Sequence, residues 1–317
     1  MKSFISGMLE NFNTFRNGID NWFSVALNMF IFKRASVCKI RNIGSVKLKK
    51  GKNYLNSSLF RALVFSNSKN LSDDQIDLLK DYIPQLNNDI ITVVNREDKK
   101  RFKFLNREMS LIFESFIYGD YSHIPYSENG SVIDVGANVA DTAIYFANKG
   151  YNVYAFEPLP HICEIAKKNI DLNPNVKDKI VFVNKACSCK NGVITINFNK
   201  EDTGGANEFM DADDSVDVEA ITIGNIIKEY NVKPDILKID CEGCEANIIK
   251  HSDLSMFNQI IMEYHTNVTG VDENTLIDLL KNQGFKLKSQ IKFIVVCKFN
   301  FNFFNMMKKL FGIQLFH

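Results

Sequence analysis

The sequence predicts an α/β fold built on a doubly wound, mostly parallel sheet, because strand-like and helix-like segments alternate along much of the chain. From Ser131 onward, short β-branched or aromatic runs at 131–135 and 152–156 flank a helix-like segment at 140–150. Strands that alternate with helices pair in parallel and carry helices on both faces of an open sheet. The segment 285–299 has the pattern of a closing hairpin, which adds an antiparallel pair.

The elements between these segments repeat the same alternation. Gly150 is placed to end the first helix, because glycine readily adopts the left-handed conformation that follows helices. Further helices are predicted at 159–173, 222–231, 243–251 and 273–284. Further strands are predicted at 179–184, 192–198, 216–222, 235–240 and 259–265. We therefore expect one α/β domain over residues 126–298.

Residues 1–125 form a less regular region in which we expect both helices and strands. The segment 71–83 begins with Ser72, a good helix cap, and continues with apolar residues at helical spacing. Residues 89–106 have the pattern of two strands around a charged turn, and 109–121 that of an apolar helix. The region is therefore predicted to be an irregular α+β segment.

The last residues, 299–317, form an aromatic, amphipathic tail that contains Lys308 and Lys309. This composition predicts a helix that docks its apolar face on the protein, with peripheral contact to a membrane surface as the alternative. The apolar stretch at 22–32 is shorter than the ~20 residues that a spanning helix needs.

Composition and charge restrict the classes of function. The chain has 317 residues, 45% of them hydrophobic, and a formal net charge of +1. This balance provides no overall field that attracts nucleic acid, so we predict no nucleic-acid partner. The opening residues lack the apolar core of an export signal, and we therefore expect a cytoplasmic protein.

The seven cysteines are expected to be reduced thiols in such a compartment. Cys241 and Cys244 have Cys-x-x-Cys spacing, which allows a zinc site to be drawn with Cys187 and Cys189. The second pair lacks the usual ligand spacing, so we predict that these thiols fill space around the sheet.

The stretch SVIDVGANVADT, 131–142, places a turn directly after the first strand of the α/β region. Ligands of open α/β sheets bind beyond the carboxyl ends of the strands. Gly136 permits a tight turn, whereas a dinucleotide turn would require further glycines where Asn138 and Asp141 stand. The acids Asp134 and Asp141 suit a ligand with a positive amino or sulfonium group. The turn therefore favours S-adenosylmethionine over a nicotinamide dinucleotide.

A further acid supports a nucleoside ligand. Glu157 ends the second predicted strand, 21 residues beyond Gly136. An acid about 20 residues after the turn is where ribose hydroxyls are bound in nucleotide-binding βαβ units. Glu157 therefore points to a nucleoside, without deciding between the two cofactors.

The stretch LKIDCEGCE, 237–245, has a strand that ends in an acid and a helix that opens with further acids. Together with VIDVGANVADT, AFEP, VNKA and IIMEYH, it resembles the FkbM family of S-adenosylmethionine-dependent methyltransferases over about residues 126–298, and is closest to family members found in archaea. The family's two motifs are matched by Asp134, Gly136, Ala137 and Asn138, and by Lys238, Ile239, Asp240, Glu242, Gly243 and Glu245. Ala140 is a departure, because the family usually has glycine there.

The resemblance implies a Rossmann-like class I methyltransferase that transfers a methyl group to a hydroxyl of a sugar, glycan or secondary metabolite. Residues 1–125 would then form a cap on the acceptor side. The cofactor contacts expected on this basis are Asp134, Gly136, Ala137, Asn138, Asp141, Thr142, Glu157, Pro158, Asn184, Ala186 and Asp240.

Methyl transfer to an alcohol is helped by a base, because the alcohol is a poor nucleophile until it loses its proton. The expected catalytic residues are His265 and Glu242, either of which could be the base, and Asp240. Glu245 is expected to be an ordinary acid of a first helical turn. Asp240, Glu242 and Glu263 could also bind a divalent cation, but their spacing in the sequence does not predict a metal site.

Two other functions remain open at this level. One is a catalytically silent adaptor that keeps the cofactor site, and the other is a nicotinamide-dependent oxidoreductase. The sequence names neither the acceptor nor the oligomeric state.

Overall fold

The structure, a computed structural model, describes residues 16–28, 34–49, 57–199, 202–207, 214–290 and 294–298. They fall into two compact units. Of the described residues, one unit comprises those from 16 to 125 together with 139–145 and 164–177, and the other comprises 126–138, 146–163 and those from 178 to 298. The predicted tail 299–317 lies outside the described residues. Among the residues described, no helix has both the length and the apolar character that crossing a bilayer requires.

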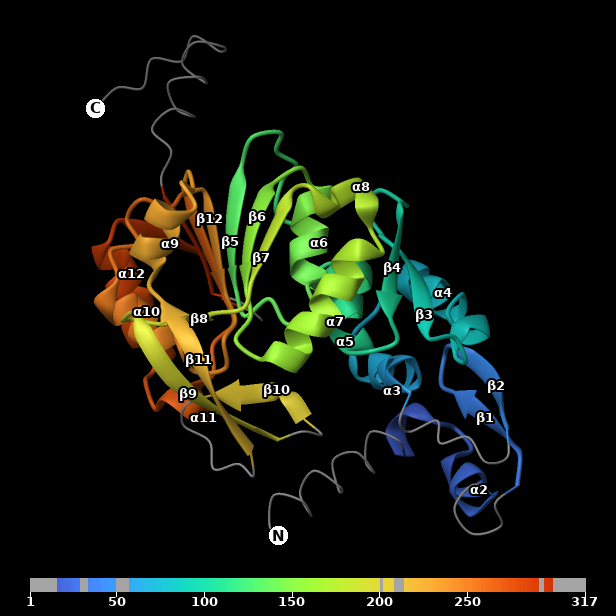
Figure 1. Cartoon of the computed structure of the whole chain (residues 1–317). Helices are drawn as coiled ribbons and strands as arrows, with labels where there is room; N and C mark the ends of the chain where they lie inside the picture. Colours follow the sequence, from blue (N-terminus) through green and yellow to red (C-terminus); the bar gives the residue numbers. More distant parts are fainter. Residues whose placement is uncertain are drawn as a thin grey trace, which may run out of the picture. The chain divides into compact units, whose positions relative to one another are not determined.

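The second unit is built on a seven-stranded sheet of order β14-β15-β13-β12-β5-β6-β7. Figure 1 labels β12, β5, β6 and β7 of this sheet. The strands are β5 (Ser131–Val135), β6 (Asn152–Phe156), β7 (Ile180–Val183), β12 (Ile236–Ile239), β13 (Gln259–Met262), β14 (Phe285–Gln290) and β15 (Ile294–Lys298). Strands β13, β12, β5, β6 and β7 pair in parallel, while β15 pairs antiparallel with both β13 and β14. The predicted mostly parallel sheet with an antiparallel closing hairpin is therefore confirmed.

The strand order reverses between β5 and β12. From β5 the chain proceeds to β6 and β7 on one side, and β12 then pairs with the other side of β5. Val135 is in register with Phe156 of β6 and with Ile239 of β12. The carboxyl ends of the three strands therefore lie side by side, at the kind of position where open α/β sheets bind ligands.

Apolar side chains of the sheet and of nearby helices form the core of this unit. The helices are α9 (Ile223–Glu229), α10 (Glu245–His251) and α12 (Glu273–Asn282), with the short α11 (Thr266–Thr269) after β13. Ile133, Leu237, Phe257 and Leu276 are completely buried in one cluster. Burial of each such side chain stabilises the fold by about 1.5–3 kcal/mol. This core holds the strands whose ends carry the candidate site.

A separate sheet of order β10-β9-β11-β8 accounts for two of the predicted strands. It comprises β8 (Ala186–Cys187), β9 (Gly192–Asn199), β10 (Asp202–Asn207) and β11 (Asp214–Ile221). The strands predicted at 192–198 and 216–222 are present as β9 and β11, and they pair antiparallel with each other. They therefore do not extend the main sheet.

The first unit contains two hairpins and several short helices, as its irregular sequence predicts. The hairpins are β1 (Ser36–Ile40) with β2 (Gly44–Leu48), and β3 (Ile90–Val94) with β4 (Arg101–Leu105). The helices are α2 (Trp22–Ala26), α3 (Ser58–Phe65), α4 (Asp73–Lys80), α5 (Met109–Phe113) and α8 (Pro174–Lys177). The predicted helix at 109–121 is α5 followed by one π-helical turn, Glu114–Tyr118, and it ends at Gly119 with φ +82°. Helices α6 (Asp141–Asn148) and α7 (Pro160–Asp171) contribute residues to both units.

Candidate functional site

The turn after β5 and the loop after β12 are in direct contact. Gly136 has φ +76°, in the left-handed region that favours glycine. A β-carbon at Gly136 would lie 1.8 Å from the carbonyl oxygen of Asp240, so a larger residue cannot be accommodated without movement of the backbone. The predicted turn is therefore present, and its glycine is required both by conformation and by packing.

Lys238 joins the same two segments from inside the sheet. Its side chain is buried, and its Nζ donates to the carbonyl oxygen of Gly136 at 2.9 Å. Nζ also lies 3.1 Å from Asp134 Oδ1 and 3.6 Å from Asp240 Oδ2. The negative charge of buried Asp134 is therefore offset within the protein, which weakens the expectation that Asp134 attracts a cationic ligand. In the sequence Lys238 stands out only as part of a motif, although a lysine within an apolar strand is a signal of such a role.

Glu157 lies buried at the end of β6 with its carboxylate held by backbone groups. Oε2 accepts from the amide of Asn138 at 3.1 Å, and Oε1 accepts from the amide of Leu159 at 2.9 Å. Burial raises the pKa of Glu157 to about 7, although the two hydrogen bonds and Lys238 oppose the shift. The Oδ1 atom of Asn138 is buried without a hydrogen-bond partner among the described residues. Glu157 and Asn138 thus place acceptor oxygens together at the strand ends.

Other expected cofactor residues adjoin Glu157. Asn184 donates from Nδ2 to the carbonyl oxygens of Glu157 at 3.0 Å and Pro158 at 2.8 Å. The amide of Ala137 donates to Phe156 at 3.0 Å, and Ala186 is buried in β8. Asn184 and Ala137 thus contact residues at the end of β6, whereas Ala186 lies in a strand of the separate sheet.

Asp141 and Thr142 belong to the first compact unit, unlike the residues above. Asp141 Oδ2 accepts a hydrogen bond from Ser115 Oγ at 2.6 Å, and both side chains are buried. This contact gives Asp141 a role within its own unit. Ala140, in the same unit, has φ +65°, a conformation in which glycine is less strained.

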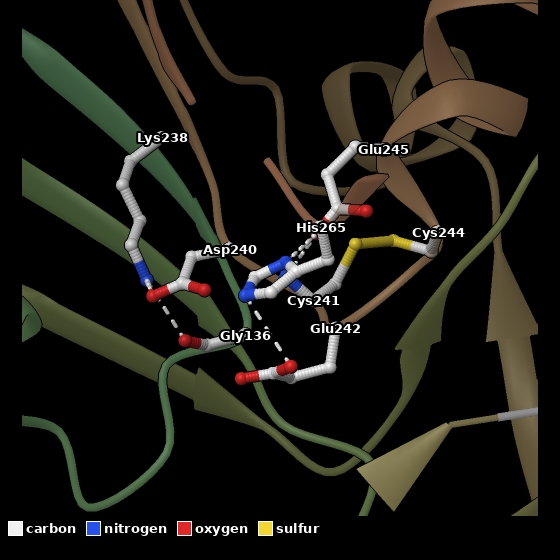
Figure 2. The surroundings of a disulfide bond; sticks show 8 residues. All are labelled: Gly136, Lys238, Asp240, Cys241, Glu242, Cys244, Glu245 and His265. Atoms are coloured by element: carbon white, nitrogen blue, oxygen red, sulfur yellow. Dashed lines mark hydrogen bonds and ion pairs between the residues drawn. A yellow bond between two sulfur atoms is a disulfide. The ribbon is translucent and has the colours of Figure 1, made fainter. Parts of the chain in front are cut away.

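His265 lies between two acids that follow β12 (Figure 2). Nδ1 is 3.0 Å from Glu245 Oε1, and Nε2 is 3.3 Å from Glu242 Oε2. Because a carboxylate can only accept, the proton on Nδ1 is donated to Glu245. Glu245 is completely buried, and its Oε1 also accepts from the amide of Cys241 at 3.2 Å. Glu245 is thus a first-turn acid of α10, as expected, and in addition it holds the imidazole, a role that its place in the sequence did not predict.

Burial and neighbouring charges shift the pKa values of His265 and Glu242. Burial opposes protonation of His265, but the hydrogen bond to Glu245 and the charges of Glu242, Glu245 and Asp240 outweigh it and raise the imidazole pKa to about 9. Burial raises the pKa of Glu242 to about 7, an effect that His265 opposes and that Asp240 reinforces. The cluster can therefore exchange a proton near neutral pH.

A disulfide joins Cys241 and Cys244 in the loop that carries Glu242 (Figure 2). The prediction that both are reduced thiols is wrong for this pair. Glu242 has φ +55° and Gly243 φ +125°, and the resulting turn brings the two cysteine α-carbons to 5.5 Å, within bonding range. The remaining cysteines, Cys38, Cys163, Cys187, Cys189 and Cys297, are not disulfide-bonded.

Comparison with known proteins identifies similar sequences and folds. Residues 134–287 match the sequence model of the Methyltransferase FkbM domain. The methyltransferase sdnD of Sordaria araneosa is 25% identical over 178 residues, which cover 45% of this chain and 66% of that protein. The chain thus spans slightly less than two thirds of that relative.

Solved structures similar to this chain include two complexes with S-adenosyl-homocysteine. TrmK of M. capricolum has a TM-score of 0.35 and 13% identity, with coverage of 56% of this chain and 65% of TrmK. The N-terminal domain of human METTL16 has a TM-score of 0.33 and 14% identity, with coverage of 61% of this chain and 70% of that domain.

Proposed function

We propose that this protein, whose residues 134–287 match the methyltransferase FkbM domain, is an S-adenosylmethionine-dependent methyltransferase acting on a hydroxyl group of a sugar, glycan or secondary metabolite. The observation that carries the proposal is the contact between the Asn138 amide and the buried Glu157 carboxylate at the ends of neighbouring parallel strands. This contact fixes the carboxylate oxygens of Glu157 as hydrogen-bond acceptors at the position where open α/β sheets bind a nucleoside.

The residues at these strand ends fit the cofactor. Two backbone amides hold the Glu157 carboxylate in one orientation, which suits a pair of ribose hydroxyl donors. Asn138 Oδ1 has no partner among the described residues, and a ligand donor would satisfy it. Asn184 braces the same strand end through its two carbonyl contacts. Glu157 and Asn138 are therefore the proposed central contacts of the cofactor.

The same positions disfavour a nicotinamide dinucleotide. A pyrophosphate requires backbone amides exposed by glycines at the start of the helix after the turn. This chain has glycine at 136, but Asn138 and Asp141 occupy the two further positions. An oxidoreductase is therefore the weaker candidate.

S-adenosylmethionine supplies an electrophilic methyl group on a sulfonium centre. The part played by the chain is to hold donor and acceptor in line and to receive the acceptor proton. Glu242 and His265 are the proposed proton-handling residues, because they form a half-buried pair beside the turn that carries Gly136. Glu245 is a positioning residue, since it fixes which ring nitrogen of His265 faces Glu242.

The acceptor is proposed to be a small molecule or glycan. A formal net charge of +1 provides no general attraction for a polyanion. A hydroxyl acceptor agrees with a paired carboxylate and imidazole, because an alcohol must lose its proton during the transfer. We further propose that residues 1–125 contribute to acceptor recognition.

Calorimetric titration tests the cofactor assignment. The purified full chain is titrated separately with S-adenosylmethionine, S-adenosylhomocysteine and NAD. The first two are expected to bind and NAD is not. Glu157→Gln should weaken binding of both sulfur nucleosides by about tenfold or more, since one charge-assisted hydrogen bond contributes about 1.5–3 kcal/mol. The matched control is Glu128→Gln, which changes an exposed acid of the same unit.

Transfer itself is followed with a methyl-labelled cofactor and fractionated glycan and metabolite pools. Label that appears in an alkali-stable ether product supports O-methylation. Tight binding of NAD with no binding of S-adenosylmethionine would overturn the cofactor assignment. Binding of S-adenosylmethionine with no transfer to any pool would favour the silent adaptor.

A further inference from the structure

We propose that Asp240, Glu242 and His265 form a binding site for one divalent first-row transition-metal ion. One ligand atom from each of the three side chains lies within 4.8 Å of the other two. Asp240 and Glu242 come from the loop after β12, and His265 follows β13. Because these two strands pair in parallel, their ends bring the three side chains together. Figure 2 shows the imidazole between the carboxylates.

The spacing agrees with coordination by a small ion. His265 Nε2 and Glu242 Oε2 are 3.3 Å apart. Two ligands that are each about 2.1 Å from a tetrahedral ion are about 3.4 Å from one another. The ligand atom of Asp240 lies within 4.8 Å of those of Glu242 and His265. All three side chains are partly exposed, so an ion can enter and retain an open coordination position.

The hydrogen bond that orients the His265 ring is of the kind found at metal centres. A metal-ligating histidine usually donates its second ring N–H to a carboxylate, which fixes the tautomer and the ring orientation. Here Nδ1 donates to Glu245, which lies outside the proposed ligand set and is completely buried. Nε2 thereby faces Glu242 Oε2 at 3.3 Å, and a metal ion that binds between these two atoms would displace the proton of Nε2.

The charges around the cluster also favour a cation. Asp240, Glu242 and Glu245 surround one imidazole, and Glu263 acts electrostatically on Glu242. Lys238 Nζ lies 3.6 Å from Asp240 Oδ2, farther than from Asp134 Oδ1 at 3.1 Å and the carbonyl oxygen of Gly136 at 2.9 Å. Mixed oxygen and nitrogen donors suit Mn²⁺ or Zn²⁺ better than Mg²⁺ or Ca²⁺, which prefer oxygen alone.

The consequence for catalysis rests on the proposed function, whereas ion binding does not. An ion at this position would bind the acceptor hydroxyl and lower its pKa. The O–H bond then breaks with release of the proton to water, the oxygen attacks the methyl carbon, and the C–S bond breaks to leave S-adenosylhomocysteine. With the ion bound, Glu242 and His265 would act as its ligands and the ion would activate the hydroxyl; the direct proton handling proposed above would apply to the protein without the ion.

Metal binding is measured on the full chain after treatment with a chelator and dialysis. Mn²⁺ is titrated while the electron paramagnetic resonance signal of the free ion is recorded, and Zn²⁺ is added as a competitor. The expected result is about one Mn²⁺ per chain, displaced by Zn²⁺. Glu242→Gln and His265→Asn should abolish saturable binding. Glu245→Gln should keep the stoichiometry and weaken binding by about 10–100-fold, as for other outer-shell partners.

His251→Asn is the matched control, because His251 is an exposed histidine of α10 whose Nδ1 lies 2.9 Å from the backbone oxygen of Asn247. Circular dichroism and calorimetric binding of S-adenosylmethionine are recorded for each variant. Should one ligand variant fail to fold, the other decides. No saturable ion in the wild type, or unchanged affinity in Glu242→Gln, would overturn the metal site while leaving the proposed function standing. Binding of the ion without any binding of S-adenosylmethionine would overturn the proposed function while leaving the metal site standing.

Discussion

Gly136 and Asp240 are packed so closely that a single methyl group cannot be placed between them. The β-carbon of an alanine at 136 would lie 1.8 Å from the Asp240 carbonyl oxygen. Because Asp240 begins the loop that also carries Glu242, the turn after β5 is in contact with the segment that carries Asp240 and Glu242. A change in the turn is therefore transmitted to the cluster.

Gly136→Ala should destabilise the fold and weaken cofactor binding. The left-handed conformation alone costs about 1–2 kcal/mol for alanine, and the displacement of Asp240 adds to it. The free energy of unfolding is measured in urea. Gly284→Ala is the control, since Gly284 has φ +89° and an added β-carbon there would have nothing within 4 Å, so it isolates the conformational cost. Equal losses in the two variants would contradict the packing argument.

Ala140→Gly should stabilise the protein. Ala140 has φ +65°, and glycine removes the left-handed strain of about 1–2 kcal/mol while adding chain entropy to the unfolded state. The expected net gain is up to about 1 kcal/mol in the free energy of unfolding. Urea denaturation measures it, and a loss of stability would show that the alanine methyl group makes a compensating contact.

The affinity for the cofactor and the stability of the cofactor-free protein should change with pH in opposite directions, because both depend on the protonation of Glu157. Its pKa is raised from 4.5 to about 7. The ionised form is the acceptor for ribose hydroxyls, so affinity for S-adenosylmethionine should fall as the pH falls through 7. The folded state binds a proton more tightly than the unfolded state, so the contribution of Glu157 to stability is present below pH 4.5 and is lost as the pH rises through 7.

Calorimetry and urea unfolding between pH 5 and about 8.5 check both signs, because this window spans the shifted pKa. Glu157→Gln should remove most of the pH dependence of both the cofactor affinity and the free energy of unfolding. If the variant retains the wild-type pH profile of affinity, another group controls it.

Lys238→Met should strongly destabilise the second unit. The substitution removes a buried ammonium group from beside the buried carboxylate of Asp134, and breaking a buried ion pair from one side costs about 3–5 kcal/mol. The double variant Lys238→Met with Asp134→Asn should recover part of that loss, because it leaves no buried charge at the pair. The free energy of unfolding of the two variants is compared. Additive losses would show that the two side chains are not energetically coupled.

The alternation of strands and helices was sufficient to predict the main sheet and its closing hairpin. The strands at 192–198 and 216–222 pair with each other in a separate sheet. Hydrophobic periodicity could not predict this, because it indicates that a segment is a strand but not which sheet the strand joins. The β1–β2 hairpin and α3 were missed although the sequence carries signals for both: Asn42 and Gly44 at the hairpin turn, and Ser57 as the cap of α3.

Within the candidate site, sequence motifs placed Gly136, Asn138, Glu157 and Asp240 at strand ends that the sheet brings together. The partner of His265 was missed, because contact with Glu245 depends on the relative positions of two strand ends. The disulfide was missed for a similar reason. The positive φ at Glu242 that brings the cysteines together is not evident from Cys-x-x-Cys spacing.

The Cys241–Cys244 bond closes a small ring around the residue that faces His265. Thioredoxin or glutathione would open that ring, and Glu242 would then sit on an unconstrained segment. Preparations handled with and without dithiothreitol are accordingly two distinct chemical species. Activities recorded for one of them should not be ascribed to the other.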